Sequence, residues 1–157
     1  MEKDIIESFF KALQNRDFKK MESCYDRNIQ YFDPLYGFLK KNEVMYMWKL
    51  FYLPLQEFNM SFENMKDEGE GYYSIQYEFS FFNQHVNRQL TRKIKSHIRI
   101  VNGLIAEQSN AFRIHEWCKQ ENGIIGVLIG WNKYYQNKIK LRARRLLFNS
   151  IDTNKFE

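Results

Sequence analysis

Asp33 is the acidic residue whose setting in the sequence most clearly suggests proton-transfer chemistry. It follows a short strand-like segment, 29–32, and precedes Pro34, which cannot donate a hydrogen bond to a sheet. A carboxylate in this setting has two interpretations. It is either a general base at the wall of a pocket, or a turn residue whose oxygens accept hydrogen bonds from the backbone that follows it. Composition alone favours the turn.

The other residue types that bind metals or act as nucleophiles are scattered along the chain. His85, His97 and His115 lack the paired spacing of a metal site, and Cys24 and Cys118 have no constellation of partners around them. Two cysteines without metal-site spacing are typical of reduced, inert thiols in a cytoplasmic protein. The sequence therefore predicts no metal site, no cofactor and a cytoplasmic location.

The positive charge of the chain is concentrated at its C-terminus. The 157 residues include 24 basic and 19 acidic ones, a formal charge of +5, and residues 133–157 hold seven of the basic and two of the acidic residues. Three interpretations of this tail are open: the solvated face of a packed helix, a contact with an anionic partner, or a contact with an acidic dimer mate. No nucleic-acid motif accompanies the tail, its apolar stripe is short, and no apolar run is long enough to span a bilayer. We therefore expect neither a nucleic acid nor a membrane as a partner.

Hydrophobic periodicity predicts three helices in the first third of the chain. Apolar residues recur at helical spacing over 5–13, over 18–25 and over 44–51, and Asp17 is placed to cap the second helix. The short strand that ends at Asp33 lies between the second and third helices. This part of the chain therefore supplies helices that need a sheet to bury their apolar faces.

The period changes to two in the middle of the chain, which predicts antiparallel strands. Apolar and polar residues alternate over 73–81 and 90–101, and Asn102-Gly103 is a hairpin signal before a further strand over 104–112. A short helix is then expected over 114–120, ended by Gly123. Asn132 would cap a last helix, whose apolar face is predicted to comprise Ile139, Ala143, Leu146 and Leu147. We expect one α+β domain over residues 1–157, with a curved sheet wrapped around the helices and an open mouth for a ligand.

The segment Tyr25–Pro34 resembles the Tyr-to-Asp-Pro segment of the nuclear transport factor 2-like superfamily, which includes steroid isomerases, SnoaL-like polyketide cyclases and limonene epoxide hydrolases. The helix–loop–helix around Asp17 and the hairpin at Asn102-Gly103 fit the same layout. The resemblance covers roughly residues 5–112. Met47-Trp48, Phe112 with Trp117, and the glycine-flanked run 126–131 are similar to a narrower, largely uncharacterised subgroup.

This resemblance implies a conical α+β barrel that dimerises through the outer face of its sheet. The core would span residues 5–112, with a C-terminal helical extension over 113–157 outside the pocket-forming part. In the steroid isomerases of this superfamily, the residue that matches Asp33 is the general base. The pocket of the cone would be lined by Phe9, Leu13, Tyr25, Trp48, Phe51, Tyr77, Ser96, Asn110 and Phe112.

Several positions depart from the isomerase pattern. Phe9 stands where that pattern has a hydrogen-bond-donating tyrosine, Lys95 or Ser96 where it has a protonated acid, and Gln108 and Asn110 where the subgroup has a histidine and an aspartate. Amides hold a ligand but do not act as acid or base near neutral pH.

Two hypotheses therefore stand. In the first, the cone binds a small apolar ligand, as in a SnoaL- or isomerase-like enzyme with Asp33 as its base. In the second, the protein is a non-catalytic homodimeric binding or interaction module with a filled pocket. An open cavity with Asp33 at its wall would favour the first hypothesis, and a pocket packed shut by Phe9, Trp48 and Phe112 would favour the second.

Overall fold

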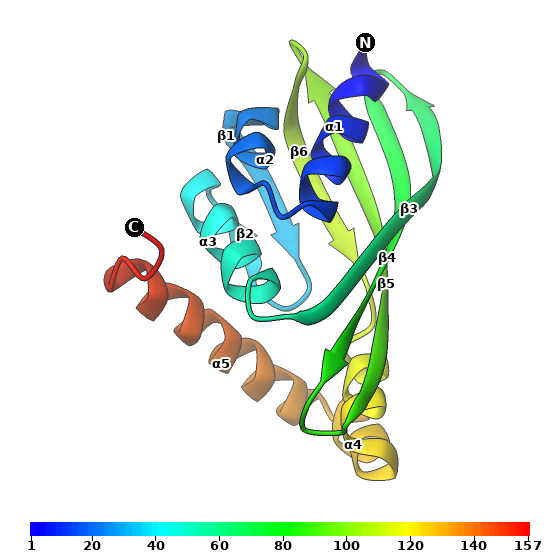
Figure 1. Ribbon diagram of the computed structural model, residues 1–157, viewed down its shortest axis with the longest axis vertical. Helices are drawn as coiled ribbons and strands as arrows, with labels where there is room; N and C mark the ends of the chain where they lie inside the picture. Colours follow the sequence, from blue (N-terminus) through cyan, green and yellow to red (C-terminus); the bar gives the residue numbers. More distant parts are fainter.

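Figure 1 presents the computed structural model, which describes the course of the chain over residues 1–157 and the side chains of residues 1–121 and 130–157. The helices are α1 (Glu2–Gln14), α2 (Phe18–Cys24), α3 (Lys41–Tyr52), α4 (Ile114–Trp131) and α5 (Lys133–Asp152). The strands are β1 (Tyr25–Asp33), β2 (Gly37–Leu39), β3 (Gln56–Gly69), β4 (Tyr72–Asn83), β5 (Arg88–Val101) and β6 (Leu104–Ala111). The expected α+β architecture is confirmed.

The strands form one curved sheet in the order β2-β1-β6-β5-β4-β3. Neighbours along this order pair antiparallel, except that β1 and β6 run parallel. The alternation over 73–81 places every second residue of β4 on the concave face, where Tyr73, Ile75, Tyr77, Phe79 and Phe81 are buried. Asn102 and Gly103 form the turn between β5 and β6 with positive φ angles, as the sequence predicts.

Helices α1, α2 and α3 lie within the curve of the sheet (Figure 1). On α1, Ile6, Phe9, Phe10 and Leu13 are fully buried, and the ring of Phe10 packs 5.2 Å from that of Tyr77. Each such side chain contributes roughly 1.5–3 kcal/mol through the apolar surface it removes from water. The Asp17 side chain accepts a hydrogen bond from the backbone N–H of Lys20, which confirms the predicted cap of α2.

The register of the sheet sets the position of Asp33. Strand β1 pairs with β6 so that Phe32 lies opposite Ser109, and Asn110 of β6 pairs in turn with Ser96 of β5. The ends of β1 and β6 therefore bring Asp33 and Asn110 together. Pro34 follows, and the chain reverses through residues 34–36 into β2.

The C-terminal part differs from the sequence prediction in two respects. Helix α4 does not end at Gly123 but continues to Trp131, and the side chains of the apolar run 124–129 lie outside the described residues. On α5, Leu147 is buried as expected, whereas Leu146 is 53% exposed, so its assignment to the buried face was wrong. Residues 146 and 147 differ by about 100° around a helix, so only one of them can point at the core. Asn132 caps α5 as predicted, since its side chain accepts a hydrogen bond from the N–H of Tyr134.

Helix α5 runs beside α3 and touches the turn after Asp33. The ring of Phe156, just beyond α5, packs 5.7 Å from that of Tyr46 on α3. The guanidinium of Arg144 donates a hydrogen bond to the carbonyl of Tyr36, and Gly37 (φ +76°) leaves room for that guanidinium. A Cβ at position 37 would lie 2.9 Å from the Arg144 Nη1 atom. The last helix is therefore tied to the segment that holds Asp33.

Candidate functional site

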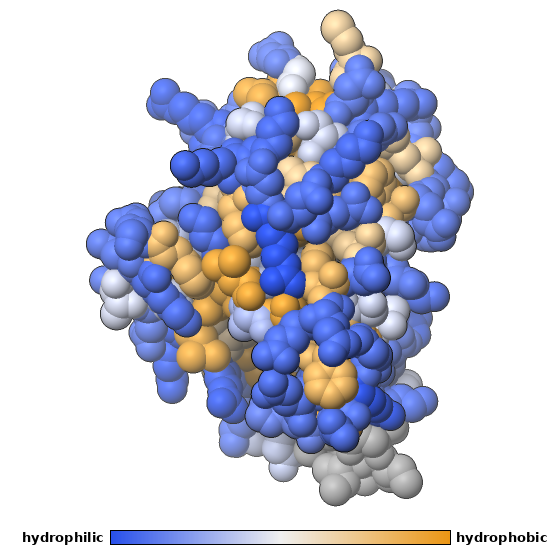
Figure 2. Space-filling model, in the orientation of Figure 1, coloured by the Kyte–Doolittle hydropathy of each residue, from blue (hydrophilic) through white to orange (hydrophobic). Residues whose placement is uncertain are grey.

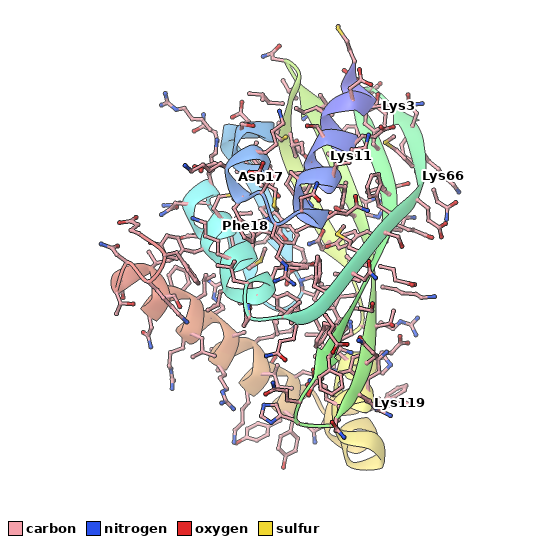
Figure 3. All side chains as sticks on the ribbon, in the orientation of Figure 1. Lys3, Lys11, Asp17, Phe18, Lys66 and Lys119 are labelled. Carbon is pink, nitrogen blue, oxygen red and sulfur yellow. The ribbon has the colours of Figure 1, made fainter. Side chains whose placement is uncertain are left out.

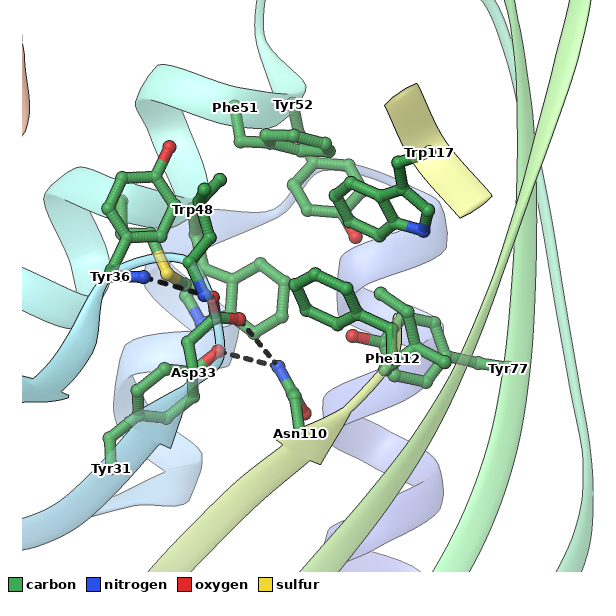
Figure 4. A pocket seen from close by; sticks show the side chains of 13 residues that line it. Tyr31, Asp33, Tyr36, Trp48, Phe51, Tyr52, Tyr77, Asn110, Phe112 and Trp117 are labelled. Atoms are coloured by element: carbon green, nitrogen blue, oxygen red, sulfur yellow. Dashed lines mark hydrogen bonds between the residues drawn. The ribbon is translucent and has the colours of Figure 1, made fainter. Parts of the chain in front are cut away.

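A small cavity lies inside the cone, between the end of β1, helix α3 and the concave face of the sheet (Figure 4). Its volume is about 20 Å³, which is room for one water molecule. The lining is mostly aromatic and aliphatic: Tyr31, Asp33, Leu35, Tyr36, Met47, Trp48, Phe51, Tyr52, Tyr77, Ile94, Asn110, Phe112 and Trp117.

Asp33 is at once a turn residue and a wall of this cavity. Its carboxylate is 6% exposed; one oxygen, Oδ1, accepts hydrogen bonds from the backbone N–H groups of Leu35 (2.8 Å) and Tyr36 (3.3 Å). The other oxygen, Oδ2, lies 3.5 Å from the amide nitrogen of Asn110. Asp33 therefore closes the turn after β1 and also lies at the wall of the cavity, the position that a general base would need.

Burial raises the pKa of Asp33 above its ordinary range, because removal from water disfavours the charged carboxylate. The hydrogen bonds from Leu35, Tyr36 and Asn110 act in the opposite direction and offset part of this effect. A carboxylate with a raised pKa holds a proton more firmly and is a stronger base near neutral pH.

Two buried polar atoms at the cavity have no partner within the part of the chain that the structure describes. They are the hydroxyl of Tyr77, on β4, and the side-chain oxygen of Asn110, whose amide nitrogen is already bound to the hydroxyl of Tyr31 at 2.7 Å. Burial raises the pKa of Tyr77 well above its usual range, so its hydroxyl keeps its proton and can donate it in a hydrogen bond. The cavity wall thus presents the Tyr77 hydroxyl, whose nearest polar neighbour is the hydroxyl of Tyr52, and the unbonded oxygen of Asn110 next to Asp33.

A second polar network lies behind the cavity, and its bonds are satisfied along its length. The indole N–H of Trp48 donates to the hydroxyl of Tyr25 (3.1 Å), which donates to the amide oxygen of Gln108 (2.7 Å). The amide nitrogen of Gln108 donates to the hydroxyl of Ser96 (3.1 Å). This chain fixes the orientation of the Trp48 ring, which lines the cavity on its other side.

Phe112 and Trp117 close one side of the cavity. Their rings stack face to face, with centroids 4.0 Å apart and planes 6° apart, and Trp117 also contacts Phe51 at 6.1 Å. Beneath Trp117 lies the buried guanidinium of Arg92, 4.9 Å from the ring and paired with Glu121 of α4 at 2.7 Å. The first turns of α4 are thereby fastened to β5 with Trp117 facing the cavity.

The structure brings together six of the ten residues that the sequence assigned to the site: Asp33, Trp48, Phe51, Tyr77, Asn110 and Phe112. The others do not line the cavity. Phe9 packs against the rings of Tyr25 and Trp48. Leu13, on α1, is buried in the core, and Tyr25 and Ser96 belong to the hydrogen-bonded network of Trp48 and Gln108. Phe9 therefore does not plug the cavity.

Trp117 is the most informative residue missing from that prediction. Sequence spacing does not show which side of a C-terminal helix faces a pocket, although the pairing of Phe112 with a tryptophan-bearing helix was a usable signal. Tyr36 and Tyr52 were missed because a turn and a helix end, respectively, bring them to the cavity.

Neither cysteine lines the cavity, and the described side chains form no metal site. Burial raises the pKa of both the Cys24 and the Cys118 thiol, which makes them less reactive near neutral pH. Among the side chains of residues 1–121 and 130–157, no group of three His, Cys, Asp or Glu residues is placed to hold a metal ion.

No family model matches the sequence, and no curated protein matches it either. Solved structures do match it. A protein of unknown function from Burkholderia pseudomallei, described as NTF2-like, superposes with a TM-score of 0.67 and 14% identity over 78% of this chain and 98% of its own. A hypothetical protein from Catenulispora acidiphila with a ketosteroid isomerase-like fold, solved with trimethylamine, gives 0.65 and 8% identity over 74% and 91%. The chain has the nuclear transport factor 2-like fold.

Known proteins with the nuclear transport factor 2-like fold differ in their chemistry, so the fold does not name a reaction. A putative SnoaL-like polyketide cyclase from Shewanella putrefaciens matches with a TM-score of 0.56 and 14% identity over 70% of this chain and 78% of its own. At such identities, the resemblance supports the architecture that the sequence predicted. The function has to be argued from the site of this chain.

Proposed function

We propose that the cone binds a small, mostly apolar molecule with one oxygen-bearing group, and that Asp33 exchanges a proton with it. The observation that carries the proposal is the pair of unused polar atoms, the Tyr77 hydroxyl and the Asn110 oxygen, buried beside Asp33. A buried polar group without a partner costs roughly 1–3 kcal/mol. A ligand carbonyl oxygen that accepts a hydrogen bond from Tyr77 would offset the part of that cost that belongs to the hydroxyl, whereas the Asn110 oxygen needs a donor, such as a hydroxyl or a water molecule.

The proposed reaction is removal of a proton from a carbon next to a carbonyl group. The C–H bond breaks, the proton moves to the Asp33 carboxylate, and the electron pair shifts to the carbonyl oxygen. A hydrogen bond from Tyr77 to that oxygen stabilises the charge that develops on it. Return of the proton from Asp33 to the same or a neighbouring carbon regenerates the carboxylate. In this proposal, Tyr77 supplies the donor that Phe9 cannot supply.

The size of the cavity sets a condition on this function. A space of about 20 Å³ holds a water molecule and nothing larger. A ligand therefore enters only when the stacked rings of Phe112 and Trp117 move apart or aside. We take the water-sized space as the closed form of the site.

The test is hydrogen–deuterium exchange at carbon. A panel of small cyclic ketones and enones in heavy water is followed by proton NMR, which measures loss of the signal next to the carbonyl. We expect the wild-type protein to accelerate exchange for at least one probe, Asp33→Asn to abolish the acceleration, and Tyr77→Phe to reduce it about 100-fold or more. Tyr73→Phe is the matched control, because Tyr73 lies on the same strand with its hydroxyl bound to Glu2 at 2.7 Å. Equal exchange by wild type and Asp33→Asn for every probe would contradict the proposal.

The second candidate function is a non-catalytic interaction module with a filled pocket, and the small volume of the cavity favours it. It predicts that no probe raises the melting temperature of the protein or changes its tryptophan fluorescence. A probe that does either, with the response lost in Tyr77→Phe, would count against this candidate.

We also propose that the protein is a homodimer that associates through the outer face of its sheet. Phe32, Phe38 and Tyr72 surround a shallow depression there, and Phe38 is 78% exposed. Exposed aromatic side chains gathered around one depression are typical of association surfaces.

A further inference from the structure

Helix α5 is strongly basic, and its one acidic residue is Asp152, at its last position. Residues 131–151 contain six lysines and arginines and no aspartate or glutamate. Arg144 is used internally, since it binds the Tyr36 carbonyl. Lys138, Arg142 and Arg145 are exposed on the side of the helix that faces away from α3.

Large apolar side chains share this outer side with the basic ones. Tyr134 is 61% exposed, Leu141 64% and Leu146 53%. Tyr134, Lys138, Leu141 and Arg145 follow one another at three- and four-residue steps, which places them along one stripe of the helix. Figure 3 shows the side chains of α5 projecting outward from the body of the molecule, and Figure 2 shows hydrophobic patches among hydrophilic ones along that flank.

The outer side of α5 exposes both basic and large apolar side chains. The sequence had instead indicated a solvated polar face and a short apolar stripe. A solvated helix face has no need of a tyrosine and two leucines held in water within 13 residues. A surface for nucleic acid uses aromatic rings and cations, but exposed leucines do not stack on bases. A membrane interface accommodates all of these: leucine and aromatic side chains enter the boundary of the acyl chains, while lysine and arginine bind anionic headgroups.

We propose that the outer face of α5, defined by Tyr134, Lys138, Leu141, Arg142, Arg145 and Leu146, binds an anionic lipid surface. The charge complementarity selects the partner, since Lys138, Arg142 and Arg145 are exposed on this face and the one acidic residue of α5 is Asp152, at its last position. The helix lies along the membrane rather than across it. Within the described residues, no helix is both long enough and apolar enough to span a bilayer.

The test is sedimentation of the full chain with vesicles. Vesicles of phosphatidylcholine mixed with phosphatidylserine are compared with vesicles of phosphatidylcholine alone, at low and at high salt. We expect the wild-type protein to pellet with the anionic vesicles, to be released by salt, and to stay in solution with the neutral ones. The triple change Lys138→Glu, Arg142→Glu and Arg145→Glu should weaken vesicle binding about 100-fold or more.

Matched controls show whether a loss of vesicle binding comes from the α5 face, from the change in net charge or from unfolding of the variant. The change Lys3→Glu, Lys19→Glu and Lys66→Glu alters the net charge equally on exposed residues elsewhere, and it should bind vesicles far better than the α5 triple variant. The double change Leu141→Gln and Leu146→Gln should weaken vesicle binding without altering charge. Circular dichroism checks that each variant is folded.

Three results would overturn the proposal. The first is failure of the wild-type protein to bind anionic vesicles at low salt, and the second is an equal loss of binding in the two triple variants. The third is retention of RNA in a filter assay that depends on Lys138, Arg142 and Arg145 while vesicles are not bound. That third outcome would assign the face to nucleic acid.

Discussion

At the scale of single residues, Asp33 combines a structural role in a turn with a position at the wall of the cavity. The same carboxylate closes the turn after β1 through two backbone N–H groups and faces an apolar cavity. Turn residues of this type are usually well hydrated, whereas burial here leaves the pKa raised. The charged form is therefore held in place by the fold at a cost in stability.

This cost predicts how Asp33 affects stability as pH changes. Because the pKa of Asp33 is higher in the folded than in the unfolded chain, its contribution is most favourable at acidic pH and declines as pH rises through the folded-state pKa. Asp33→Asn removes this dependence and keeps an oxygen for the backbone N–H groups. We expect the free energy of unfolding of Asp33→Asn to exceed that of wild type at neutral pH, with the difference shrinking toward pH ~4. Urea titrations at several pH values measure this, and a difference that grows toward acid would contradict it.

The contact between Gly37 and Arg144 gives a second prediction for single residues. Gly37→Ala places a Cβ at a positive φ and 2.9 Å from the Arg144 guanidinium, whereas Gly103→Ala has a similar φ (+74°) with open space around it. Both changes should lose about 1–2 kcal/mol from the backbone conformation.

Gly37→Ala should lower the free energy of unfolding by more than Gly103→Ala does. The reason is that the Arg144 guanidinium must move away from the Tyr36 carbonyl to make room for the new Cβ. Urea unfolding of the two variants gives the comparison, and Arg144→Met in the Gly37→Ala background should remove the excess. Equal losses of unfolding free energy in the two alanine variants would show that the Arg144 side chain moves aside without a cost in stability.

At the scale of elements, α4 sets the size of the cavity. Trp117 fills space between Phe112 and Phe51 and is fastened through Arg92 and Glu121. Trp117→Ala should reduce stability by about 2–3 kcal/mol, less than for a fully buried tryptophan, and should leave a space of the shape of an indole ring.

Added indole should therefore raise the melting temperature of Trp117→Ala but not that of wild type. Trp131→Ala is the control, since Trp131 is 70% exposed and its removal should change stability little. A lack of response to indole in Trp117→Ala would mean that the surrounding rings collapse into the space.

The comparison of sequence and structure is also clearest at this scale. Alternation predicted β4 and β5, because one face of each strand is buried and the other is not. The end of α4 was not predictable from Gly123, because a single glycine costs a helix only about 1 kcal/mol. The site was predictable where strands carry it, at Asp33, Tyr77 and Asn110. It was not predictable at Trp117 or Tyr36, because their positions depend on how a helix and a turn pack against the rest.

At the scale of the whole molecule, the sheet has two faces with different roles. The concave face holds the helices and the cavity, and the outer face exposes Phe32, Phe38 and Tyr72. A substitution on the outer face should therefore change association without changing the cavity.

For the proposed dimer, Phe38→Lys should shift sedimentation equilibrium from dimer to monomer, because a charge would be buried at the interface. Phe38 is exposed in the single chain, so its replacement should leave the fold of each chain intact. Tyr134→Lys, on α5, is the control and should remain dimeric. A monomeric wild-type protein, or a dimeric Phe38→Lys, would exclude this face as the interface.

The hydrogen bond from Arg144 to the Tyr36 carbonyl connects the candidate site to the last helix of the chain. The carbonyl belongs to the turn whose N–H groups hold Asp33, and the arginine lies more than 100 residues later, on the last helix. A truncated version that stops after the sheet would lose both this brace and Trp117. Transplanting the site into another protein of the same architecture would consequently require the last two helices as well as the cone.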